Sequence, residues 1–254
     1  MTTHDTSPTT AGRGPGVGAA AGGGAGVPDP APTTTPASAT ATRVRPQPRG
    51  WALAGIAAGL TGLVGIQASM ALGINWEQTA GDAGAIVADL SGRTTALLVF
   101  HTATIVSALL VVVFAAGLSR RLSQQAPAGS LLPAVASGGL LLVAVAGLLG
   151  SGLDTQFIFG LADVDLIVPE SGAFFSDWIA TIPWLWVGAG LSGVAVAVAA
   201  LRHAAAPRWL GWVGAVPGGL TLLLGVSPLQ YMAGFTGPLW LLVTAIGFAV
   251  GDRR

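Results

Sequence analysis

The chain has 254 residues, of which 52% are hydrophobic and only 9% are charged, and its mean hydropathy is +0.71. A charged share so far below the ~25% of ordinary soluble domains excludes a soluble globular protein and indicates a multi-pass membrane protein. Its 11 basic residues, all arginine, balance 11 acidic residues. The absence of cysteine excludes disulfides, thiolate metal sites and cysteine nucleophiles.

Residues 1–48 are built mainly from Thr, Pro, Ala and Gly. This composition offers too little bulky apolar surface to offset the entropy of ordering, so it predicts a disordered cytoplasmic tail. A partner-binding or phosphorylated Thr-rich segment and a plain solvated extension are both open interpretations. Arg43, Arg45 and Arg49 directly precede the first apolar run at Trp51, which predicts that the first span is an uncleaved signal anchor.

Six apolar segments follow, over about residues 51–74, 94–118, 131–153, 178–201, 209–226 and 230–250. An α-helix rises ~1.5 Å per residue, so segments of this length suit a hydrocarbon core of ~30 Å. The predicted fold class is therefore all-α: a bundle of six transmembrane helices over residues 50–251. Between the first two spans, the piece DAGAIVADLS predicts a short interfacial helix, because Ile86, Val87 and Leu90 can share one face.

The arginines predict the orientation of the spans. Ten of the 11 arginines fall in the tail, in the loops or at the end on one side of the membrane, and only Arg93 falls on the other. Eight of the 11 acidic residues fall on the side of Arg93. Under the positive-inside rule, this distribution predicts that both termini are cytoplasmic.

Gly55 and Gly59 form a small-xxx-small pair in the first span. Such a pair lets another backbone approach closely, either in a homo-oligomer or between helices of one bundle. Contact within the bundle is the preferred interpretation, because glycine is so frequent in this chain that such pairs arise by chance.

Polar residues gather at the predicted outer ends of the spans. The candidate ligand-binding residues of a polar outer pocket are Gln67, His101, Asp154, Gln156, Asp177, Gln230 and Tyr231. The alternative is that they are ordinary interface residues, which are polar in any membrane protein. Gln67 and His101 are the most informative of the set, because they should lie below the lipid headgroups and need partners.

The histidine positions argue against common cofactors. A bis-histidine haem needs two facing imidazoles, but His203 lies at the opposite end of the bundle and His4 lies in the tail. A zinc site lacks an H-E-x-x-H motif or a second nearby histidine. Ser151, Asp154 and His101 share the outer side, but their order and spans do not match a rhomboid-type protease. No cofactor, metal or catalytic residue is predicted.

Transport is the second functional hypothesis. Spans five and six are interrupted by glycine and proline, at Pro217 and Pro238 with their neighbouring glycines, a feature of discontinuous transporter helices. An ordinary proline kink explains the same pattern. The inner halves of the spans are nearly all Ala, Val, Leu and Gly, which favours a small-molecule-binding sensor or accessory subunit over a transporter or channel.

The segments LLGSGLDTQFIFGLAD, IPWLWVGAG, RWLGW and LTLLLGVSPLQYMAGF resemble the uncharacterised six-span integral membrane proteins of actinobacteria. The resemblance covers roughly residues 50–251 and implies a bacterial plasma-membrane protein without a known activity. It carries no functional residue. The predicted partners are the lipid bilayer, a small-molecule ligand and a second copy of the chain through the Gly55/Gly59 face; nucleic acid is not predicted as a partner.

Overall fold

The computed structural model describes residues 49–79 and 81–251. The predicted disorder of residues 1–48 lies outside the described residues. Helices make up the described chain almost throughout, no strand occurs in it, and six helical segments are long and apolar enough to cross a membrane. The predicted all-α class and the number of spans are therefore confirmed.

The first two membrane-length segments are uninterrupted, and the other four consist of shorter pieces. The bounds along the chain are α1 Gly50–Ala71, α2 Trp76–Thr79, α3 Ala83–Ser91, α4 Thr94–Ser123, α5 Leu132–Gly152, α6 Asp154–Gly160, η1 Val164–Leu166, α7 Pro169–Thr181, η2 Ile182–Trp184, α8 Val187–His203, α9 Arg208–Val213, η3 Gly214–Gly218, α10 Gly219–Val226, η4 Gln230–Met232 and α11 Ala233–Gly251. Segment three thus continues through α6, segment four begins at Pro169 rather than near Trp178, and η3 divides segment five.

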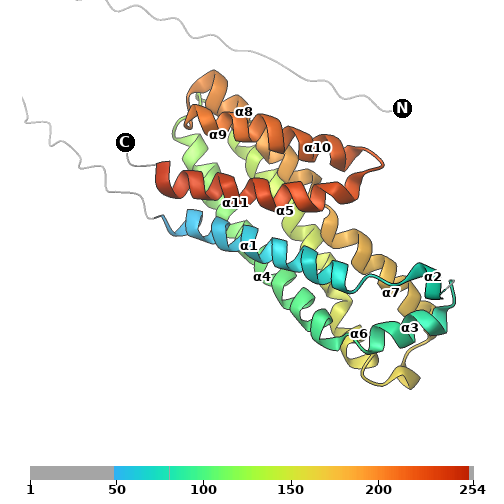
Figure 1. Cartoon of the computed structure of the whole chain (residues 1–254). Helices are drawn as coiled ribbons and strands as arrows, with labels where there is room; N and C mark the ends of the chain where they lie inside the picture. The colour runs from blue at the N-terminus through green and yellow to red at the C-terminus, as the bar shows by residue number, and fades with distance from the viewer. Residues whose placement is uncertain (1–48, 80, 252–254) are drawn as a thin grey trace, which may run out of the picture. The chain divides into compact units, whose positions relative to one another are not determined.

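The helices pack mainly as sequence neighbours, and α11 closes the bundle against α1 (Figure 1). Glycines bring the backbones close together at these contacts. Gly55 and Gly59 are both buried, the first against Phe114 and Ala245 and the second against Leu242. The small-xxx-small pair is therefore used between helices of the same chain, as the preferred interpretation expects.

The described residues form two hydrophobic cores. The larger core fills the bundle and includes Trp51, which packs on Phe114 and Phe248 with ring centroids 5.5 and 5.4 Å apart. The smaller core joins α3, α6 and α7 to the neighbouring ends of α1 and α4, and it contains Phe157 stacked on Phe175 at 4.1 Å. We call α2, α3, α6, η1 and α7 together the outer lobe. Figure 1 shows α2, α3, α6 and α7 together at one end.

The predicted short helix is present in the outer lobe as α3. Its N-terminus is capped by Asp82, whose side chain accepts a hydrogen bond from the Ala85 N–H. Ile86, Val87 and Leu90 are buried in the smaller core. The prediction of a helix with these three residues on one face is therefore confirmed, but that face is buried in protein and does not lie on lipid as an interfacial helix would.

The two ends of the bundle differ in charge. The described arginines other than Arg93 lie at the end that also carries Gly50 and Gly251, and we call it the arginine end. All eight described acidic residues lie at the opposite end, with the outer lobe, and we call it the acidic end. Because six segments separate Gly50 from Gly251, both lie at the same end (Figure 1).

Candidate functional site

A histidine and an aspartate from different segments meet at the acidic end. His101, in the second turn of α4, places Nδ1 3.1 Å from Oδ2 of Asp154, the first residue of α6. The Asp154 side chain is completely buried, whereas that of His101 is 22% exposed. Asp154 Oδ1 is also buried and has no hydrogen-bond partner among the described residues. The pair therefore consists of a buried carboxylate with one open acceptor and an imidazole that reaches the surface.

Local structure explains how Asp154 reaches this position. Helix α5 ends at Gly152, and after Leu153 the chain starts the short helix α6 with Asp154 in its first turn. Trp178 of α7 steadies the same junction, because its indole Nε1–H donates to the Gly150 carbonyl oxygen at 3.0 Å.

Of the seven predicted pocket residues, His101 and Asp154 are joined by a hydrogen bond in the described chain. Gln67, Gln156 and Asp177 are exposed, Tyr231 is 42% exposed and Gln230 is partly exposed. None of these five side chains makes a hydrogen bond or ion pair within the described residues. The candidate site is therefore the His101–Asp154 pair rather than a polar pocket formed by all seven residues.

Ser151 is not arranged as a nucleophile. It is buried one turn before Asp154, and its hydroxyl donates to the carbonyl oxygens of Gly147 and Leu148, both at 3.1 Å. A serine nucleophile would instead donate to the histidine that activates it. Within the described residues no group of three or more His, Asp or Glu side chains is placed to hold a metal ion.

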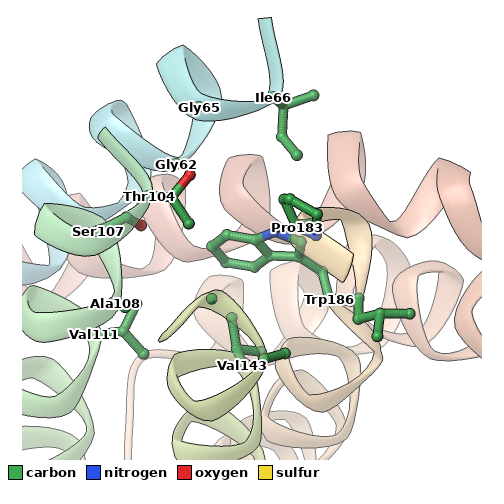
Figure 2. A pocket seen from close by; sticks show the side chains of 13 residues that line it. Gly62, Gly65, Ile66, Thr104, Ser107, Ala108, Val111, Val143, Pro183 and Trp186 are labelled. Atoms are coloured by element: carbon green, nitrogen blue, oxygen red, sulfur yellow. Dashed lines mark hydrogen bonds between the residues drawn. The ribbon is translucent and has the colours of Figure 1, made fainter. Parts of the chain in front are cut away.

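A small cavity lies in the bundle, close to the pair. Its volume is about 30 Å³, and a water molecule needs ~10–15 Å³ on the same kind of measure. Helices α1, α4 and α5 and the break between α7 and α8 enclose it; Figure 2 shows the Trp186 ring between Thr104 and Ser107 on one side and Pro183 on the other. Thr104 Oγ1 makes no hydrogen bond with the described residues, and the Ser107 hydroxyl donates to the Ala58 carbonyl oxygen at 2.9 Å.

The pair and the cavity lie along the same two membrane-length segments, α4 and the segment formed by α5 and α6. Thr104 follows His101 by three residues on α4, a rise of ~4.5 Å, and Gly147 precedes Asp154 by seven residues, a rise of ~10 Å. The cavity thus lies one to two helical turns from the pair, towards the arginine end. Beyond it, α4 continues with Phe114, Leu118 and Leu122, all fully buried, so the cavity ends against a packed apolar core.

The break that borders the cavity is formed by the sequence Ile182-Pro183-Trp184-Leu185-Trp186. Pro183 has no N–H to donate; Trp184 is the last residue of η2, and Trp186 directly precedes α8. Trp184 donates its indole N–H to Ser69 Oγ at 2.9 Å and lies against Gly234. Trp186 donates to the Pro183 carbonyl oxygen at 3.1 Å and lies against Gly62 and Gly237. Glycines on α1 and α11 therefore provide the space for both rings.

Sequence reasoning missed the cavity residues Thr104, Ser107 and Trp186. The available signal was the polar spacing His101, Thr104, Ser107 along one helical stripe, together with the Pro between aromatic residues in segment four. Tryptophans near the end of a membrane span are typical of the membrane–water interface, but Trp184 and Trp186 are buried at 8% and 5% exposure.

Comparisons with protein-family models, with curated proteins and with solved structures find no match to this chain. The resemblance to six-span actinobacterial membrane proteins accordingly stays a prediction, and the function has to be argued from the site.

Proposed function

We propose that this protein is a plasma-membrane sensor or accessory subunit that binds a small protonated amine from the outer side, at His101 and Asp154. In this proposal the arginine end and both termini face the cytoplasm, and the acidic end faces outward. The positive-inside distribution of the arginines supports that orientation.

The observation that carries the proposal is the open acceptor of a fully buried carboxylate. Asp154 Oδ2 has His101 as its partner, but Oδ1 has none among the described residues. A buried polar group without a hydrogen bond is costly, and a buried charge is more so. Such groups persist where function requires them, particularly within membrane segments.

The chemistry of the pair favours an organic cation. When Asp154 is ionised, His101 Nδ1–H donates to Oδ2, and a neutral imidazole leaves one net negative charge in the site. A metal ion generally needs three or more protein ligands, and the described residues offer no such group. An ammonium group supplies both a positive charge and N–H donors for Oδ1.

Thermal unfolding of the full chain in detergent tests the proposal with ethylammonium chloride as the probe. Ligand at ten times its Kd stabilises the folded protein by about 1.4 kcal/mol, which is about 3–6 °C in Tm for a chain of this size. We expect ethylammonium to raise Tm, and sodium chloride at equal ionic strength not to do so.

Two variants provide the comparison. Asp154→Asn removes the charge of the site and should abolish the Tm increase, whereas Asp177→Asn removes an exposed charge at the same end and should retain it. An equal increase in the wild type and in Asp154→Asn would contradict the proposal, as would no increase at any ethylammonium concentration.

Transport of the same cation is a second candidate, favoured by the discontinuous segment four. Transporter sites form where membrane helices are broken, and the break at Ile182–Trp184 borders the cavity. Proteoliposomes containing the full chain should accumulate labelled ethylammonium in exchange for internal ethylammonium if it is a transporter. A sensor that binds the amine without passing it shows the Tm increase and no accumulation.

A further inference from the structure

A groove at the arginine end opens between α4 and α5, away from the His101–Asp154 pair. Its volume of about 510 Å³ lies within the range of ~300–1,000 Å³ typical of small-molecule sites. The lining residues used below are Val112, Ala116, Ser119 and Arg120 from α4, and Ser137 and Leu141 from α5.

The groove has a polar mouth and an apolar body. Ser119, Arg120 and Ser137 lie towards the ends of α4 and α5 that meet at the arginine end, and Val112, Ala116 and Leu141 lie deeper in the bundle. From Ser123, also at the mouth, to Val112 is 11 residues of helix, a rise of ~16 Å. One leaflet contributes about half of a ~30 Å hydrocarbon core, so the groove matches the depth of a single leaflet.

The charge at the mouth is positive and uncompensated within the described chain. Arg120 is exposed and makes no ion pair or hydrogen bond with the described residues, and the Ser119 hydroxyl makes no hydrogen bond either. All described acidic side chains lie at the opposite end. A guanidinium and a hydroxyl are the donors that hold phosphate oxygens well.

We propose that this groove holds one anionic phospholipid. The lipid phosphate binds Arg120 and the Ser119 hydroxyl, and one acyl chain lies along Val112, Ala116 and Leu141. Basic pockets between membrane helices recognise acidic headgroups in this way, and the one-leaflet length selects a lipid over a free phosphate ion.

Native mass spectrometry of the full chain, released from detergent micelles, tests the site with phosphatidylglycerol and phosphatidylcholine of identical acyl chains. We expect one phosphatidylglycerol to be retained in preference to phosphatidylcholine. Arg120→Gln should weaken that retention about fivefold, which corresponds to ~1 kcal/mol for one basic residue near an anionic headgroup. Arg202→Gln, which alters an exposed arginine at the same end but outside the groove, should leave it unchanged.

Ala116→Trp tests the groove separately from the charge, because Ala116 is exposed and its replacement fills the acyl-chain path. It should reduce phosphatidylglycerol retention while Arg120 is intact. Equal retention of both lipids, or equal effects of Arg120→Gln and Arg202→Gln, would overturn the proposal. Displacement of the lipid by millimolar inorganic phosphate would indicate an anion site only. A changed oligomeric state in Ala116→Trp with unchanged lipid retention would make the groove an interface between copies of the chain.

Discussion

Asp154 differs from every other acidic residue that the structure describes, because its side chain alone is completely buried. The sequence left two interpretations of Asp154 open, a ligand-binding residue of a polar pocket and an ordinary interface residue just after a predicted span. In the structure Asp154 is the first residue of α6 and is buried inside the protein, beside His101. The sequence could place both residues at the same end of the bundle, but their contact depends on how α4 and α5 pack.

Replacing His101 should destabilise the protein, because Asp154 then loses its hydrogen-bond partner. His101→Leu leaves Asp154 without a hydrogen bond to either oxygen, at a cost of ~1–3 kcal/mol. Combining it with Asp154→Asn removes the buried charge and should recover more than half of the loss. The measurement is Tm of the full chain in detergent for the two single variants and the double variant.

His203→Leu is the matched control, since His203 is exposed at the arginine end, and its effect should stay within ~0.5 kcal/mol. If His101→Leu lowers the stability by no more than this control, the pair contributes nothing to stability. The same conclusion follows if the double variant loses as much stability as the two single variants together.

Arg93, the exception to the positive-inside distribution, has local partners. Its guanidinium bonds both oxygens of Asp89 at 2.7 and 2.8 Å, and it also donates to the carbonyl oxygens of Ala71 and Gly73 at 3.0 and 2.7 Å. The spacing of Asp89 and Arg93 by four residues is visible in the sequence. The bonds to the end of α1 are not, because they require α1 and α4 to be neighbours. Arg93 therefore joins α1 to the start of α4.

At the scale of elements, apolar length predicted the six segments, but their interruptions depend on tertiary contacts. Pro183 alone would allow a kinked helix; the observed break also needs the glycine spaces that receive Trp184 and Trp186. In segment five the π-helical turn Gly214–Gly218 contains Pro217, and the Thr221 hydroxyl donates to the Pro217 carbonyl oxygen at 2.8 Å. The glycines and the proline of this segment are visible in the sequence, but they do not specify a π-helical turn.

Two adjacent glycines in segment five should respond oppositely to alanine. A Cβ added at Gly218 would lie 2.8 Å from the Gly193 Cα of α8, whereas one added at Gly219 meets no atom within 4 Å. Gly218→Ala should therefore push two backbones apart and cost ~1–3 kcal/mol. Gly219→Ala should be neutral or stabilise by up to ~1 kcal/mol, because alanine favours the helix.

Thermal unfolding of the two variants under identical conditions checks this prediction. A Gly218→Ala protein as stable as Gly219→Ala would show that α8 and segment five are not in backbone contact in the membrane.

At the scale of the whole molecule, the two ends carry different chemistry. The acidic end holds the outer lobe, with its own apolar core and the His101–Asp154 pair. The arginine end holds the phospholipid groove, and Phe114, Leu118 and Leu122 are buried in the larger core at the same level of α4 as the groove. A bundle whose core is packed towards the arginine end suits binding from the acidic end. This division also makes the orientation of the chain decisive for the proposed function, since the amine site must face outward.

Reporter fusions test the orientation directly. Because six segments separate the chain ends and the short loops at the arginine end carry the positive charge, a green fluorescent protein fused after Arg254 should fluoresce, and alkaline phosphatase at the same position should be inactive. Alkaline phosphatase inserted after Asp165, in the exposed stretch of the outer lobe, should be active. The reverse pattern at both positions would place His101 and Asp154 on the cytoplasmic side, and the proposed site could not receive an amine from outside.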